Sequence, residues 1–222
     1  VQVGLVEDVT AVTLERRRIE HERDYDVLTG LYNRRAFDAR AKKLFRMPEK
    51  LGHAALLMMD MDNLKQINDT FGHDWGDRYI NLAGQCFAQT LPPNTICARM
   101  SGDEFIVLFY GYGRRDEIRQ VLNRLSEAMK ERTALLPNGD TMRISISGGI
   151  AWYPENGRDL AMLKKYADFA MYQVKHESKG EMGEFDIGAY NQEAYAAQLR
   201  REFLQMLRES LSLIHISEPT RR

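Results

Sequence analysis

The sequence is poor in cysteine, and its charges of the two signs almost cancel. Only two cysteines, Cys86 and Cys97, occur among 222 residues. Because they have neither metal-ligand spacing nor the density of a disulfide scaffold, we expect buried, reduced thiols in a cytosolic protein. The 31 Lys and Arg against 32 Asp and Glu give a net charge of -1. This balance provides no general attraction to nucleic acid or to an anionic membrane, so we expect no nucleic-acid partner.

The sequence also lacks a hydrophobic run that suits a membrane span. The longest stretch without charge, residues 79–98, includes amide side chains, threonines and two prolines, which hydrocarbon accepts only at high cost. We therefore expect no membrane contact from this segment and a cytoplasmic location, although a full-length parent protein can still be anchored in a membrane.

The two ends differ in character from the middle. The sequence begins at Val1 without Met or a signal-peptide pattern, so we expect a fragment of a larger signalling protein. Residues 1–25, a short strand and a charge-dense helix, resemble the end of a PAS sensor domain and the signalling helix after it. Residues 188–210 have an amphipathic helical pattern and resemble the helix or linker that leads into an EAL phosphodiesterase domain. Residues 211–222 do not continue this pattern, and we interpret them as a non-native tail.

Residues 26–187 alternate between strand and helix patterns. The apolar run 54–59 predicts a buried strand, and two apolar runs around the polar turn 101–103 predict a central hairpin. Another strand is expected over 142–151. Helices are expected after Asn33, after Asp62, from about Asp77, over 114–133 and over 159–175. This order predicts an α+β fold in which helices cover an antiparallel or mixed sheet.

Acidic residues stand where the predicted strands end. Asp60 and Asp62 follow the first strand, while Asp103 and Glu104 lie at the tip of the hairpin. If the strands are neighbours, four carboxylates converge, and a fold keeps such repelling groups together mainly when a cation sits among them. Oxygen-only ligation selects Mg²⁺ or Mn²⁺, and two such ions can bridge a nucleoside triphosphate and activate an attacking hydroxyl.

Each of these residues also has an ordinary interpretation when it is taken singly. The pattern Asp-x-Asp occurs often by chance. Asn68 and Asp77 suit turns or helix caps, and Lys65, Lys175 and Lys179 suit a solvated surface. Only the conjunction of these residues favours a functional site.

Six motifs give that conjunction a family resemblance. In order, they are DVLTGLYNRR at 26–35, DMDNLKQIND at 60–69, FGHDWGD at 71–77, RMSGDEF at 99–105, SGGIA at 147–151 and ADFAMY at 167–172. Together they resemble the GGDEF family of diguanylate cyclases. The resemblance implies a palm-like, ferredoxin-like sheet of the nucleotidyl-cyclase type over residues 26–187. It also implies that two GTP molecules become cyclic di-GMP and two pyrophosphates in a dimer of domains, each holding one GTP.

The resemblance assigns metal and catalytic roles residue by residue. Asp60, Met61 and Asp103 would ligate Mg²⁺ or Mn²⁺. Glu104 would support the metal site or activate the 3′-hydroxyl, and Lys65 would act with them on the phosphates.

Substrate binding falls to a second set of residues by the same resemblance. Asn68 and Asp77 would read guanine, because a carboxylate accepts from guanine's N1 and N2 donors and leaves the wrong base unpaired. Lys175 and Lys179 would contact phosphates, and Gly102 would let the backbone approach the nucleotide closely.

The sequence departs from the family at a few positions. Ser101 replaces the first Gly of the signature; if that position needs a positive φ, a Ser costs about 1–3 kcal/mol in backbone strain and crowds the nucleotide. Residues 178–180 replace the family's usual Gly, basic residue, Asn. Pro92 and Thr95 stand where the family has the Arg and Asp of its product-inhibition site, so we expect no feedback inhibition through that site.

Two functions remain open at this point. The domain is either a working cyclase, or a weak or inactive GTP-binding module that regulates an adjoining EAL-type phosphodiesterase domain.

Overall fold

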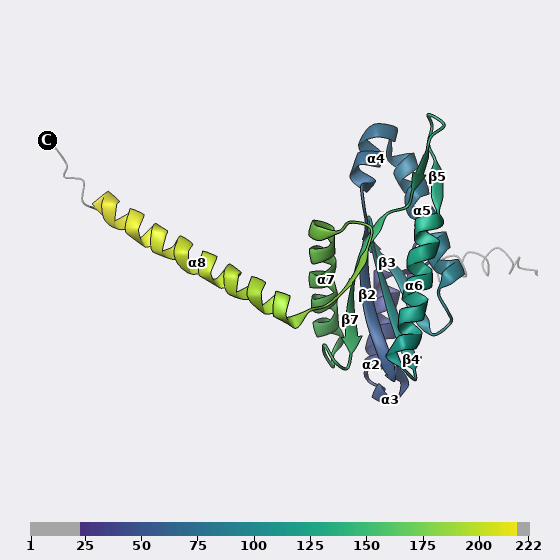
Figure 1. Ribbon diagram of the computed structural model, residues 1–222, viewed down its shortest axis with the longest axis horizontal. Coiled ribbons are helices and arrows are strands. Elements are labelled where there is room, and N and C mark those ends of the chain that lie inside the picture. The colour runs from purple at the N-terminus through teal and green to yellow at the C-terminus, as the bar shows by residue number, and fades with distance from the viewer. Residues whose placement is uncertain (1–22, 217–222) are drawn as a thin grey trace, which may run out of the picture. The chain divides into compact units, whose positions relative to one another are not determined.

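The structure is a computed structural model that describes residues 23–216, drawn in colour in Figure 1. The chain forms two units, one that ends at Phe185 and one that begins at Asp186. Most of the upstream segment expected over residues 1–25 lies outside the described residues. None of the described helices is long and apolar enough to cross a membrane.

The first unit is built on a six-stranded mixed sheet with the order β1-β3-β4-β2-β7-β8. Its strands are β1 (Tyr32–Asn33), β2 (His53–Met61), β3 (Thr95–Ser101), β4 (Glu104–Tyr112), β7 (Ile146–Tyr153) and β8 (Met182–Glu184). The central strand β2 pairs antiparallel with β4 and β7, while β1 and β8 add parallel edges. This arrangement confirms the predicted α+β fold and the central hairpin.

A second, two-stranded sheet stands apart from the first. It pairs β5 (Thr133–Leu135) with β6 (Thr141–Arg143). The strand expected over 142–151 is therefore two strands, because the chain leaves the ladder between Arg143 and Ile146. At this break the Ser145 carbonyl accepts a hydrogen bond of 2.9 Å from the Asp62 amide.

Helices cover both faces of the main sheet (Figure 1). They are α2 (Arg34–Phe45), α3 (Pro48–Leu51), α4 (Leu64–Phe71), α5 (His73–Thr90), α6 (Arg115–Glu131) and α7 (Leu160–Glu177). Asn33 and Asp159 cap α2 and α7, their side chains accepting from backbone amides at 3.0 and 2.8 Å, as the sequence predicted. The helix expected from about Asp77 begins at His73, because Gly72, at φ 88°, already breaks the chain between α4 and α5.

Alternation along the strands divides the core between the two faces. On β4, Phe105, Val107 and Phe109 pack beneath α5 and α6, while Ile106 and Leu108 pack beneath α2 and α7. This is the two-residue period of a strand buried on both faces. The packed sheet holds the ends of β2 and of the β3–β4 hairpin side by side.

Helix α7 approaches the sheet closely because β7 has a glycine beneath it. A Cβ built on Gly149 would lie 2.1 Å from both the Ala167 carbonyl oxygen and the Met171 amide nitrogen. Any larger residue would push the helix away from the sheet. The glycine therefore sets the position of Lys175 in the last turn of α7.

The second unit contains the helix α8 (Ile187–Ile216). We expected the helical pattern to stop near residue 211, and this was wrong, because the helix continues to Ile216. The added residues include neither glycine nor proline, and the first helix-breaking residue in the sequence after them is Pro219.

Candidate active site

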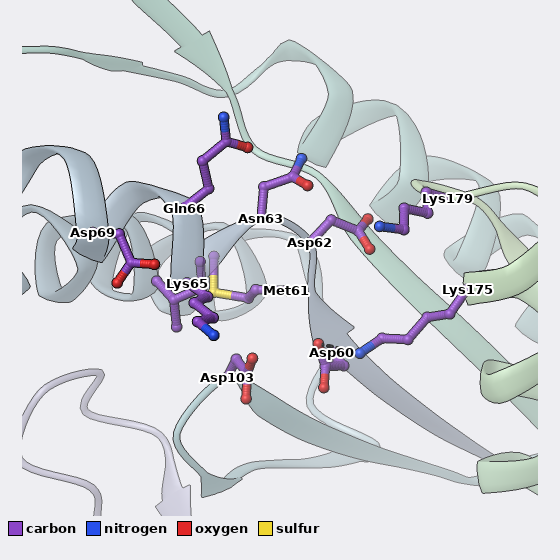
Figure 2. Close-up of a pocket in the computed structure, with 11 residues that line it drawn as sticks. Asp60, Met61, Asp62, Asn63, Lys65, Gln66, Asp69, Asp103, Lys175 and Lys179 are labelled. Atoms are coloured by element: carbon purple, nitrogen blue, oxygen red, sulfur yellow. Dashed lines mark ion pairs between the residues drawn. The ribbon is translucent and has the colours of Figure 1, made fainter.

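A cavity of about 460 Å³ opens where β2 ends (Figure 2). Its walls come from the end of β2, the beginning of α4, the turn of the β3–β4 hairpin and the segment around the end of α7. The lining residues are Asp60, Met61, Asp62, Asn63, Leu64, Lys65, Gln66, Asp69, Asp103, Lys175 and Lys179. The fold thus brings together seven of the residues singled out in the sequence, from segments more than a hundred residues apart.

The hairpin turn is fixed beside β2 by backbone pairing. Asp60 and Glu104 are partners in the register of β2 and β4, and the Met61 amide donates to the Asp103 carbonyl at 3.1 Å. Asp60, Asp103 and Glu104 therefore gather at one edge of the sheet. Met61 itself is buried, and its thioether is a soft ligand that does not suit Mg²⁺, so only its backbone carbonyl can serve a hard cation.

Asp62 also lines the cavity, but its carboxylate is bonded to two serine hydroxyls, so the expectation of four converging carboxylates was wrong. Its side chain is 4% exposed and accepts hydrogen bonds from the hydroxyls of Ser145 at 2.7 Å and Ser147 at 2.8 Å. A buried carboxylate is stable only when its oxygens are paired in this way. Asp62 therefore ties the end of β2 to the start of β7.

Asp60 has an unfavourable environment for its negative charge. Burial raises its pKa, and the neighbouring charges of Asp103 and Glu104 raise it further, while Lys175 acts in the opposite direction. The ammonium of Lys175 lies 2.5 Å from an Asp60 carboxylate oxygen, as the dashed line in Figure 2 shows. The Lys175 ammonium therefore compensates part of the negative charge that Asp60, Asp103 and Glu104 concentrate there.

This environment suits a divalent cation held jointly with a substrate. Among the described residues, no group of three or more His, Cys, Asp or Glu is arranged to hold a metal ion. Mg²⁺, however, is commonly bound through one or two carboxylates plus substrate phosphates. Asp60 and Asp103 fit that pattern, and their mutual repulsion would be relieved by the ion.

Positive charge lines the same cavity. Lys65 lies in the first turn of α4, and Lys175 and Lys179 come from the end of α7 and the residues just after it. The altered sequence at 178–180 still places Lys179 in the cavity wall. Gly180, at φ 82°, turns the chain there, and its amide donates to the Ser147 hydroxyl at 3.1 Å.

The two residues expected to read guanine lie outside the cavity lining. Asn68 is on α4, and its Oδ1 is buried without a hydrogen-bond partner. Asp77 is exposed on the neighbouring helix α5. A buried amide oxygen without a donor is costly, so Asn68 has unused capacity to accept a hydrogen bond.

Residues of the first motif also hold the signature turn at 101–104, a contact that was not predicted from the sequence. Arg99 donates through Nε to the Gly102 carbonyl at 2.9 Å and forms an ion pair of 3.3 Å with Asp26. Gly102 does not line the cavity, but its φ of 42° forms the turn. The only sequence signal was that Asp26 and Arg99 are opposite charges within two of the motifs.

Ser101 is not strained. It is the last residue of β3 and has no positive φ, because Gly102 takes that conformation instead. Its hydroxyl donates to Glu104 Oε2 at 2.7 Å. The expected strain penalty at Ser101 is therefore absent.

Comparison with known proteins agrees with this architecture. The family model described as "Diguanylate cyclase, GGDEF domain" matches residues 23–181. The cyclic di-GMP phosphodiesterase NbdA of Pseudomonas aeruginosa is 31% identical over 192 residues, which cover 86% of this chain and 24% of NbdA. The diguanylate cyclase TpbB of the same species is 33% identical over 168 residues, which cover 75% of this chain and 38% of TpbB.

A solved structure has the same palm-like sheet. The crystal structure of the TpbB GGDEF domain matches with a TM-score of 0.66 and 31% identity, and the match covers 72% of this chain and 99% of that one. The chain spans a half or less of the length of the first curated relatives it matches, between 24% and 50%. Its sequence motifs, sheet topology and matches together make this chain a member of the GGDEF domain family.

Proposed function

We propose that this domain is a diguanylate cyclase that condenses two GTP molecules into cyclic di-GMP and releases two pyrophosphates. The main support is the cavity at the end of β2, where Asp60 and Asp103 lie among Lys65, Lys175 and Lys179. Carboxylates suit a cation and lysines suit phosphates, so a metal-bound nucleoside triphosphate complements both.

The chain's own residues divide the work in this proposal. Asp60 and Asp103, with the Met61 carbonyl, hold Mg²⁺ or Mn²⁺, and the bound ion neutralises phosphate charge and favours ionisation of the 3′-hydroxyl. Lys175 exchanges its Asp60 partner for a phosphate oxygen when the nucleotide binds. Glu104 is placed to support the metal site or to accept the hydroxyl proton.

Each of the two bond-forming steps forms and breaks bonds within the two GTP molecules only. A 3′-oxygen attacks the α-phosphorus of the other GTP, the bond to the β-phosphate oxygen breaks, and pyrophosphate leaves with the electron pair. Two such steps close the ring. Because each domain holds one GTP, two copies must face each other, and we propose a homodimer in the cytoplasm whose input is an upstream sensor domain.

Base selection is assigned to the α4–α5 pair. Asn68 Oδ1, which is buried without a donor, can accept from an amino group of guanine, and the Asp77 carboxylate can accept from N1 and N2. Adenine presents an acceptor where guanine N1 donates, so it would leave these oxygens unpaired.

A second candidate function is regulation without catalysis. NbdA is named a cyclic di-GMP phosphodiesterase, although its match covers 86% of this chain. A related domain therefore occurs in a protein named for the breakdown of cyclic di-GMP and not for its synthesis. In this alternative the domain binds GTP and controls an adjoining EAL-type phosphodiesterase domain.

The test is product formation by the full chain, forced to dimerise through a fused coiled coil. The fusion is incubated with GTP and Mg²⁺, and cyclic di-GMP is followed by chromatography. Asp103→Ala should abolish turnover, whereas Asp116→Ala, which removes an exposed carboxylate on α6 outside the cavity, should leave it intact. No product from the wild type, together with a GTP-dependent rise in melting temperature, would instead favour the regulatory function.

A further inference from the structure

We propose that Ser101 is a positioning residue that holds Glu104 in place for cation binding at the acidic edge of the sheet. The inference depends on the proposed function, because it concerns the same metal-dependent site. The glycine that the family signature has at this position has no side chain with which to make the contact. The substitution is then a supporting element of this site rather than a defect.

The contact spans the signature turn itself. Ser101 and Glu104 are paired residues of β3 and β4, separated only by Gly102 and Asp103. The Ser101 hydroxyl donates to Glu104 Oε2 at 2.7 Å, within the usual range for a hydroxyl bonded to a carboxylate. One such bond uses a single acceptor position, and a carboxylate has about four. Glu104 therefore keeps free lone pairs for a cation or for a water molecule bound to it.

The rest of the turn is already fixed by the backbone. Arg99 binds the Gly102 carbonyl, and the Met61 amide binds the Asp103 carbonyl. Neither contact restrains the side chain of Glu104, which is partly exposed and has three rotatable bonds. Among the residues that the structure describes, Ser101 is the one that donates a hydrogen bond to this side chain.

Charge repulsion makes that restraint consequential. Glu104 is the register partner of Asp60 and contributes to the raised pKa of Asp60. Burial, and after it the charge of Glu104, also raises the pKa of Asp168 on α7. With Asp103 adjacent in the chain, three other carboxylates favour rotation of Glu104 toward solvent. The hydroxyl of Ser101 opposes that rotation, because it donates a hydrogen bond that holds the Glu104 carboxylate beside β3.

Hydrogen-bond partners of metal-binding carboxylates commonly affect metal affinity or activity by about 10-fold to 100-fold. We therefore expect loss of the Ser101 hydroxyl to weaken cation binding in this range while leaving the fold intact. Ser101 is exposed and unstrained, so small substitutions should be tolerated structurally.

The test measures cation binding directly. Free Mn²⁺ is followed by electron paramagnetic resonance in the presence of the full chain and a non-hydrolysable GTP analogue. Ser101→Ala and Ser101→Gly should bind Mn²⁺ about tenfold more weakly or worse. Ser101→Thr, which keeps a hydroxyl, should stay within about threefold of wild type. Ser126→Ala, on α6, is the matched control and should bind like the wild type.

The outcomes separate this inference from the proposed function. Equal Mn²⁺ binding by the wild type, Ser101→Ala and Ser101→Gly, with loss in Asp103→Ala, would overturn the role of Ser101 and leave the metal site standing. A wild type that binds no more Mn²⁺ than Asp103→Ala would overturn the metal site itself. Weak binding in the Ala and Gly variants with recovery in the Thr variant would support the positioning role.

Discussion

Gly76 offers a sharp test of the proposed guanine site, because it lies against the side chain of Asn68. A Cβ built on Gly76 would lie 1.9 Å from Asn68 Oδ1, 2.9 Å from its Cγ and 3.3 Å from its Nδ2. The first of these distances is far inside van der Waals contact. Gly76→Ala therefore forces the amide of Asn68 out of its present position.

The size of the effect follows from two opposing contributions. Replacing a glycine by alanine inside a helix ordinarily stabilises the fold by about 0.5–1 kcal/mol. Inserting a methyl group into a filled space typically costs about 1–3 kcal/mol. We expect the collision to dominate, giving a net loss of about 1 kcal/mol in the free energy of unfolding. If the displaced Asn68 no longer reaches guanine, a loss of about 1.4 kcal/mol would weaken GTP binding tenfold.

A double-mutant cycle with Asn68→Ala identifies the cause. Thermal unfolding and GTP affinity by calorimetry are measured for both single variants, the double variant and the wild type. In the Asn68→Ala background there is no amide to displace, so Gly76→Ala should be neutral or stabilising, with a coupling of about 1 kcal/mol or more. Equal losses from Gly76→Ala in both backgrounds would exclude the collision with the Asn68 amide as their cause.

Three further variants probe the edge of the sheet. Asp60→Asn should abolish turnover yet raise the melting temperature. Burial and like charges raise the Asp60 pKa above 3.8 in the folded state, so ionisation of Asp60 destabilises the wild type increasingly as the pH rises from 3.8 through the pKa of the folded state. The difference in melting temperature between the variant and the wild type should therefore widen as the buffer approaches neutral pH. A constant gap across pH would contradict this. Asp62→Ala should cost about 2 kcal/mol in urea unfolding, since buried Ser147 loses its acceptor, and an unchanged midpoint would exclude the bond as a stabilising contact. Arg99→Ala should lower kcat about tenfold with little change in KM, because it releases the Gly102 carbonyl rather than a substrate contact; a change confined to KM would argue against this role.

Local chemistry made much of the fold predictable. Asn33 and Asp159 were recognisable as helix caps because a cap needs only a short polar side chain before an amphipathic run. The hairpin was visible because two apolar runs enclose a polar turn with Gly102. The place of Asp60 near the end of β2 followed from the apolar run before it, although the strand continues through Asp60 to Met61.

The errors lie where the answer depends on distant partners. Asp60 and Asp62 are the same residue type two positions apart. Asp62 has a structural role because Ser145 and Ser147, just before and at the start of β7, donate hydrogen bonds to its carboxylate. The ion pair of Asp26 with Arg99 joins residues 73 positions apart. The short edge strands β1 and β8, of two and three residues, have too few residues to show a period. In each case the missing information was tertiary.

The ion pair between Asp26 and Arg99 has a mechanical consequence. Asp26 belongs to the segment by which the chain enters the sheet, and just before it Asp24 is paired with Arg35 on α2. From Asp26, two polar contacts reach the Gly102 carbonyl in the signature turn. These contacts form a polar connection between the entering segment and the signature turn that does not pass through the hydrophobic core. A displacement of the entering segment would therefore act, through Arg99, on the turn that precedes Asp103 and Glu104.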